Sequence, residues 1–257
     1  MINQEIFKNL DKCKKQIEID FDCDLSKNQE GKKIMLRGES KWYSKTEPSM
    51  KRFITAQDGK SMNPFYYLSP FLDFQDLFTE HHSKASSIDK DVAEGFLQHY
   101  GFPTDIFDIS PSFDTAVIFS HLGNYDEEIG TICVADNIGL SKYYKVIDLS
   151  LHPFAKRPKN QIAFGAKHER GISDLKDSGL DNHFNIKWYK FIKSEKDIEY
   201  AKTQSNKIYP SEREIGFFFS NELDNFVKKH FTYGKICKEN KEKILEMLNK
   251  IRNDNFK

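Results

Sequence analysis

Short apolar runs bounded by turn residues predict that strands dominate the second half of the chain. The runs are rich in β-branched and aromatic residues, which favour strands. Strands are expected at Gly130–Ala135, Tyr143–Leu149, Gln161–Ala166, Trp188–Ile192 and Ile215–Phe219. One earlier strand is expected at Lys33–Arg37, where Gly38 stops it.

Helical spacing of apolar residues is clearest in the first half. Residues 64–80 predict a helix with an aromatic face. A second helix is expected between Ser87, a suitable N-cap, and Gly101, which suits the left-handed position after the last turn. Its apolar face consists of Ile88, Val92, Phe96 and Tyr100. A basic amphipathic helix is expected at the C-terminal end, on Ile244, Leu248 and Ile251.

The stretch 104–122 predicts a strand that leads directly into a helix. Alternation along the strand places Asp105 on the same face as Phe107 and Ile109, and Asp108 on the opposite face. Ser110 is expected to cap the helix and Pro111 to be its first residue, with the helix continuing to about Leu122.

The order of these elements indicates an α+β fold. Helices come early, strands predominate later, and strands do not alternate strictly with helices, as they would in a doubly wound sheet. We expect one α+β domain over residues 31–230. Residues 1–30 are expected to form a helical or irregular segment, and residues 231–257 a basic helix packed on the same domain.

Charge changes this picture only locally. The 39 basic and 39 acidic residues cancel, so no overall field attracts nucleic acid or a membrane surface. Residues 91–141 contain no Lys or Arg, whereas residues 228–257 contain nine against four Asp or Glu. The basic C-terminal helix is therefore a candidate surface for RNA or DNA, although a solvated helix face is the more ordinary explanation.

The cysteines and the hydropathy pattern point to the cytoplasm. Cys13, Cys23, Cys133 and Cys237 show no metal-binding spacing, which is typical of free thiols in a reducing compartment. No apolar run approaches membrane-spanning length, and the first residues lack an apolar signal core. We therefore expect no membrane association.

Several motifs together resemble the FRG-domain family over roughly residues 31–230. The most specific pair is Leu-Arg-Gly at 36–38 and His-Tyr-Gly-Phe-Pro-Thr at 99–104. Further matches are Trp42, Pro48-Ser49-x-x-Arg52, Asp108 with the run 112–120, Arg157-Pro158-x-x-Gln161-x-Ala163-Phe164 and Ile208-Tyr209-Pro210. The chain departs from the family's pattern at Asp105, where an arginine is usual, and at Ile109, where a tryptophan is usual.

The order of these motifs is also similar to that of ADP-ribosyltransferases carrying Arg, Ser and Glu on successive strands. This second resemblance implies a largely antiparallel sheet split around a cleft that binds NAD as substrate. Arg37 would bind the pyrophosphate, Gly38 would let the backbone approach the carboxamide, and Ser110 would orient a carboxylate. The third position would be Glu214 or Gln161; a carboxylate there stabilises the positive charge that develops on the ribose. No metal is expected.

Each candidate also has a structural interpretation. Arg37 fits a structural ion pair, Ser110 a helix cap, and Asp108 an acceptor that braces the loop at 99–104. His99 suits a partly buried histidine as well as a substrate contact, and Tyr100 a core residue as well as a nicotinamide stack. Gln161 supplies no charge, and Glu214 suits a helix start for dipole reasons alone.

Three functional hypotheses follow. The first is an NAD-dependent ADP-ribosyltransferase, which the resemblance associates with toxins of toxin–antitoxin or anti-phage systems and hence with an antitoxin or inhibitory partner. The second is a catalytically inert module that binds a nucleotide or a partner, which Asp105 favours because it replaces a cation. The third is a metal-dependent nuclease using Asp105 and Asp108, although these lie on opposite strand faces.

Overall fold

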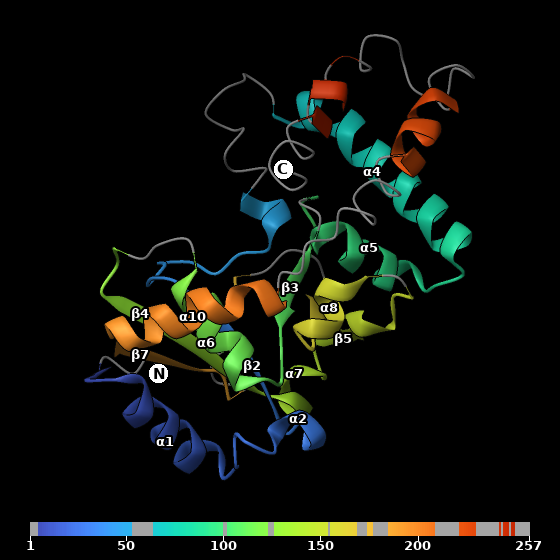
Figure 1. The fold of residues 1–257 in the computed structure, drawn as a ribbon. Helices are drawn as coiled ribbons and strands as arrows, with labels where there is room; N and C mark the ends of the chain where they lie inside the picture. Colours follow the sequence, from blue (N-terminus) through green and yellow to red (C-terminus); the bar gives the residue numbers. More distant parts are fainter. Residues whose placement is uncertain are drawn as a thin grey trace.

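The computed structural model describes residues 5–52, 64–99, 102–122, 126–153, 155–168, 174–176, 185–208 and 221–229, with residues 242, 244–246 and 248–249. It is an α+β fold built on two sheets (Figure 1). Strands Lys33–Arg37, Gly130–Ala135, Tyr143–Leu149 and Trp188–Ile192 are confirmed to within three residues. The helix predicted over residues 64–80 is also present, and it continues to Ser86.

The first sheet has the order β1-β7-β4-β2 and carries helices on one face. Its strands are β1 (Ile6–Phe7), β2 (Ile34–Glu39), β4 (Ile129–Asp136) and β7 (Lys187–Ile192). Only β1 and β7 are parallel; the other pairs are antiparallel. Helices α1 (Leu10–Phe21) and α6 (Phe113–His121) cover one face and share a buried core with it, and α10 (Glu195–Ile208) packs on α6.

The second sheet is antiparallel, with the order β3-β6-β5. Its strands are β3 (Ile106–Ile109), β5 (Tyr144–Asp148) and β6 (Phe164–His168). Leu36 of β2 and Ser110, directly after β3, exchange two main-chain hydrogen bonds of 2.8 Å. Because the two strands pair at this single bridge and then diverge, the sheets are joined at one point and split beyond it.

Alternation along the strands explains which residues form each core. Leu36 packs with α1 and α6, whereas its neighbour Met35 packs between the two sheets with Phe107, Ile109 and Trp188. Ile106, on the opposite face of β3, packs in a separate cluster with Val92 and Leu149. The predicted faces of this strand are therefore correct, and burial of these apolar groups is the main stabilising contribution.

A third group of helices surrounds an aromatic cluster. It contains α4 (Pro64–Ser86), α5 (Lys90–His99) and α8 (Lys156–Asn160). Phe74, Phe78 and Phe96 pack there against residues 223–227, and Ile244 and Leu248 belong to the same cluster. Short helical turns complete the fold: α2 (Asn28–Gly31), α7 (Asn137–Leu140) and the 3-10 turn η1 (Leu149–Leu151).

Three local predictions at helix and strand ends are wrong. Ser110 does not cap α6: Ser112 does, accepting a hydrogen bond of 3.2 Å from Thr115 N–H, so Pro111 precedes the helix. Ser87 lies in the left-handed region after α4, and the Asp89 carboxylate accepts from Asp91 N–H at the start of α5.

The third wrong prediction concerns the strand expected from residue 161. Gln161 is the C-cap of α8, and β6 begins only at Phe164. The predicted strand Ile215–Phe219, the expected Gly101 turn and Ile251 lie outside the described residues.

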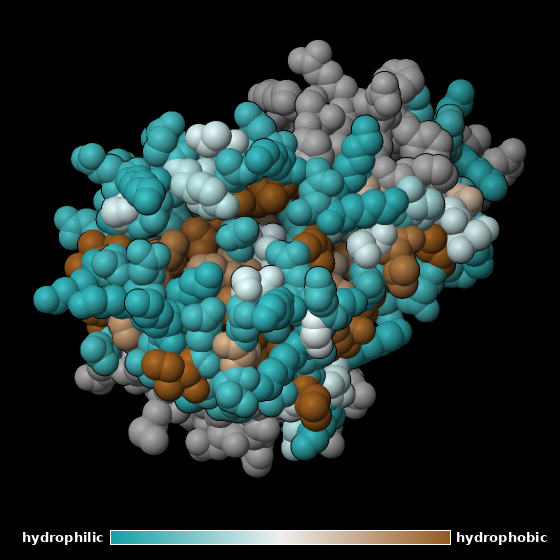
Figure 2. Space-filling model, turned by 60° about the horizontal axis from the view of Figure 1, so that its bottom comes forward, coloured by the Kyte–Doolittle hydropathy of each residue, from teal (hydrophilic) through white to brown (hydrophobic). Residues whose placement is uncertain are grey.

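The described surface offers no continuous apolar face in the view of Figure 2, where hydrophobic residues form separate patches among hydrophilic ones. Among the described residues, no helix combines the length and apolar character needed to cross a bilayer.

Candidate functional site

Arg37 lies at the meeting point of three neighbouring cavities. Strand alternation places its side chain on the same face of β2 as Glu39, beside the point where the two sheets separate. The cavities have volumes of about 90, 180 and 280 Å³, and Arg37 lines all three. Together they reach the range of ~300–1,000 Å³ found for small-molecule sites.

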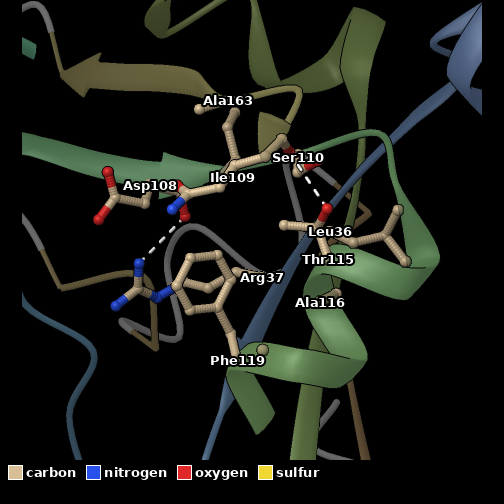
Figure 3. Close-up of a pocket in the computed structure, with 11 residues that line it drawn as sticks. Leu36, Arg37, Asp108, Ile109, Ser110, Thr115, Ala116, Phe119 and Ala163 are labelled. Atoms are coloured by element: carbon tan, nitrogen blue, oxygen red, sulfur yellow. Dashed lines mark hydrogen bonds between the residues drawn. The ribbon is translucent and has the colours of Figure 1, made fainter. Parts of the chain in front are cut away.

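The smallest cavity brings together most of the predicted site residues (Figure 3). Residues from β2, the end of β3, the turn after α8 and one face of α6 line it. The predicted residues among them are Arg37, Gly38, Asp108, Ser110 and Gln161. Groups that are distant in the chain thus meet where the sheets split.

The Arg37 guanidinium is held mainly by a neutral partner. Its Nη1 donates to the main-chain oxygen of Asp108 at 3.0 Å, as Figure 3 shows. Its Nε lies 3.6 Å from a carboxylate oxygen of Glu39, so the predicted ion pair exists but is loose. Because a guanidinium has five N–H donors, Arg37 retains donors for a ligand.

Ser110 and Gln161 are tied to each other and to the main chain. Ser110 Oγ donates to Gln161 O at 2.9 Å and accepts from Ser112 N–H at 3.1 Å. The Gln161 side chain donates to Ile208 O, at the end of α10, at 3.0 Å. Both side chains therefore brace the wall of the cavity, and neither is directed by its hydrogen bonds towards a ligand.

Gly38 has a packing role that the sequence did not reveal. A Cβ atom at this position would lie 1.9 Å from Ala116 O and 2.7 Å from Ser120 N. The backbone of α6 thus touches β2 directly, which fixes the helix and its Phe119 ring beside Arg37.

Asp108 is the acidic residue that lines the smallest cavity. Its Oδ1 accepts from the Gln98 amide at 2.5 Å, and the Gln98 oxygen accepts in turn from Thr104 Oγ1. Asp108 lines both the smallest cavity and the 180 Å³ cavity, which it shares with Arg37 and Arg52. The carboxylate is thus bonded to a side-chain amide, and the residue lies where the two cavities adjoin.

Glu39 is a site residue that sequence reasoning missed. It is buried and accepts from Thr46 Oγ1 at 2.7 Å, and the buried Lys176 ammonium lies 3.2 Å away. Lys176 in turn lies over the rings of Trp42 and Trp188, at 3.9 and 4.2 Å from their centroids. The available signal was the Arg-Gly-Glu spacing, which places both charged groups on one strand face.

The remaining predicted residues lie elsewhere or outside the described part of the chain. His99 ends α5, where its main-chain oxygen accepts from Arg157 Nη1 at 3.2 Å, and it lines none of the three cavities. Tyr100 and Glu214 lie outside the described residues. The glutamate of the expected third position is therefore not placed.

Asp105 does not share a site with Asp108. Burial raises the pKa of Asp105, and the nearby Lys167 ammonium opposes this shift. Asp105 lines none of the cavities around Arg37. Across the described residues, no three His, Cys, Asp or Glu side chains are grouped as metal ligands. The geometry therefore offers no support for a two-aspartate metal site.

Comparison of the chain with protein-family models, with curated proteins and with solved structures finds no match in any of the three.

Proposed function

We propose that the cleft around Arg37 binds NAD and that the chain is an ADP-ribosyltransferase. One observation carries the proposal: Arg37, Gly38, Asp108, Ser110 and Gln161 come from separate segments and line one cavity. The cavity thus joins the Arg and Ser positions of the Arg–Ser–Glu order with Gln161, one of the two candidates for the third position. FRG-domain membership and a toxin role are part of the same proposal and rest on the sequence resemblance.

The chemistry requires a cation for the pyrophosphate and an anion beside the ribose. In the reaction the bond between C1′ and the nicotinamide nitrogen breaks, and its electron pair leaves with nicotinamide. Positive charge develops on the ribose, and an acceptor nucleophile then bonds to C1′. Arg37 supplies bidentate donors for the pyrophosphate, and Asp108 is the acidic residue among the described residues that line the same cavity.

The test is nicotinamide release and label transfer from NAD. The purified chain is incubated with NAD labelled on the adenylate, with and without cell lysate, and label is sought in protein, RNA and DNA. Arg37→Ala and Asp108→Asn should each reduce nicotinamide release by at least about 100-fold. Lys51→Ala, a charge change that borders none of the cavities, serves as the control. A folded protein that releases no nicotinamide under any of these conditions would contradict the proposal.

A specific observation favours a second candidate, the inert binding module. The side chains of Ser110 and Gln161 are committed to main-chain partners. In addition, among the described residues the strands after β3 contribute no carboxylate to the smallest cavity. An inert module would bind NAD or ADP-ribose in the same cleft without releasing nicotinamide. Equilibrium binding measured beside turnover therefore separates the two.

A further inference from the structure

The 280 Å³ cavity on the outer side of Arg37 is rich in cations. Its described lining includes Arg37, Lys45 and Arg52 against one carboxylate, Glu39. Tyr43 and Phe119 supply aromatic walls. Among the described residues that line this cavity, the three cations therefore outnumber the carboxylates.

Glu39 is neutralised by Lys176, a residue that does not line the cavity. Its carboxylate lies 3.2 Å from the Lys176 ammonium and 2.7 Å from Thr46 Oγ1, but 3.6 Å from Arg37 Nε. Lys176 is itself buried and does not line the cavity. Because the buried lysine neutralises Glu39, the three lining cations give this cavity a net positive charge.

The two guanidinium groups are positioned by main-chain carbonyls. Arg37 donates to Asp108 O and Arg52 donates to Glu47 O. Within the described part of the chain, neither Lys45 nor Arg52 forms an ion pair with a carboxylate. Desolvation and, after it, repulsion from Arg37 lower the pKa of Arg52. An anion between the two arginines would relieve that repulsion.

The neighbouring 180 Å³ cavity has a different balance. It shares Arg37 and Arg52 but adds the carboxylates of Asp108 and Glu47. The two arginines thus stand between a cationic side at Lys45 and an acidic side at Asp108. A ligand with a phosphate group at one end and a group that gains positive charge at the other would complement this polarity.

We infer that the Lys45 side of the cleft is a diphosphate-binding subsite, in which Lys45 and Arg52 hold the ligand's phosphates together with Arg37. The inference rests on the proposed function in that the diphosphate would belong to NAD. It goes beyond that function by assigning the contact to two residues outside the Arg–Ser–Glu positions.

Binding of inorganic pyrophosphate and of ADP-ribose, measured by calorimetry, tests the subsite without requiring turnover. Lys45→Ala and Arg52→Ala should each weaken both affinities by about tenfold, because each removes a charge-assisted contact. Lys51→Ala removes the same charge from a neighbouring position that borders none of the three cavities and should leave both affinities unchanged. Raising the ionic strength should weaken binding to the wild type more than to the two variants.

The outcomes separate this subsite from the enzymatic proposal. If pyrophosphate binding depends on Lys45 and Arg52 but NAD is never consumed, the subsite stands and the transferase proposal fails. If NAD is consumed while both variants bind pyrophosphate like the wild type, the subsite is wrong and the transferase proposal stands. If neither pyrophosphate nor ADP-ribose binds, the subsite is wrong. It is also wrong if the protein does not bind ADP-ribose but binds a short oligonucleotide through Lys45 and Arg52.

Discussion

The Arg37 guanidinium donates a hydrogen bond of 3.0 Å to the main-chain oxygen of Asp108, although 71 residues separate the two in the chain. This bond spans the split between the sheets, because Arg37 lies on β2 and Asp108 on β3. It also leaves the Asp108 carboxylate to Gln98 and to the cleft. Arg37 therefore both links the two strands at the site and contributes one of its positive charges.

Replacing Arg37 should weaken the fold only modestly. Arg37→Ala removes one hydrogen bond and a loose ion pair, so the free energy of unfolding should fall by about 1–2 kcal/mol. Urea unfolding followed by circular dichroism measures this change. Retention of a cooperative transition would show that loss of NAD turnover in this variant reflects the site, whereas an unfolded variant would show that Arg37 is mainly structural.

Gly38 should tolerate no side chain. An added Cβ would meet the main chain of α6 at 1.9 Å, and two backbone segments cannot separate without moving the helix. Gly38→Ala should therefore lower the free energy of unfolding by about 3 kcal/mol or more. Gly31→Ala is the matched control, since an added Cβ there meets nothing within 4 Å; it should be neutral or slightly stabilising. Similar unfolding midpoints for both variants would contradict the close packing.

The Glu39–Lys176 pair should behave as a coupled buried ion pair. Each single variant, Glu39→Gln or Lys176→Met, leaves the other charge buried, and such losses cost about 3–5 kcal/mol. The double variant should cost clearly less than the sum of the two, which a double-mutant cycle of urea unfolding free energies measures. Additive losses would show that the two groups, 3.2 Å apart, do not depend on each other.

Sequence reasoning located most of the described strands and several residues that line the cavities around Arg37, but not the contacts that join them. The alternation of Phe107 and Ile109 against Ile106 correctly assigned two different cores, because side-chain period is a local property of a strand. The helix cap, in contrast, was wrongly predicted at Ser110. Ser110 and Ser112 are both suitable cap residues, and Ser112 takes the role because Ser110 pairs with Leu36, which lies far away in the chain.

Glu39 was missed and Gln161 was misplaced for a similar reason, because their surroundings are set by tertiary packing. Glu39 becomes part of the site through Lys176, which lies 137 residues later and is not marked by any motif. Gln161 was expected on a strand because apolar residues follow it. Pro158 and Asn160 instead belong to the short helix α8, so the chain turns at Gln161 before β6 begins. Such long-range partners are set by tertiary packing and leave no local signal.

A buried chain of hydrogen bonds links α4 to η1 and to the helix at 221–229. Ala155 N–H donates to His152 Nδ1 at 3.1 Å, so a neutral His152 carries its proton on Nε2. That Nε2 lies 3.1 Å from His82 Nε2, and His82 Nδ1 lies 2.9 Å from a Glu222 carboxylate oxygen. With both histidines neutral, every donor in this chain has an acceptor. Protonating His152 leaves no place for the extra proton on Nδ1, which already accepts from Ala155.

This arrangement predicts a loss of stability in acid. Burial, and after it the electrostatic effect of His82 and Lys159, lowers the pKa of His152 to about 3. Histidine in the unfolded chain has a pKa of about 6.5. Between these values the unfolded state binds a proton that the folded state does not, so the free energy of unfolding should fall by up to about 1.4 kcal/mol per pH unit as the pH drops below about 6. Above about pH 7 this contribution is complete and constant.

Urea unfolding at a series of pH values between about 4.5 and 7.5 measures that slope. His152→Phe preserves the stack on Phe96, whose ring centroid lies 4.1 Å from that of His152, and removes the titrating group. The variant should be less stable near neutrality, since His82 loses a partner. The slope of its unfolding free energy against pH should be smaller than that of the wild type by the equivalent of about one proton. Because Glu222, His81 and Lys159 surround the pair and are unchanged in the variant, the difference between the two pH slopes isolates His152. Equal slopes would show that this histidine is protonated as readily in the folded protein as in the unfolded chain.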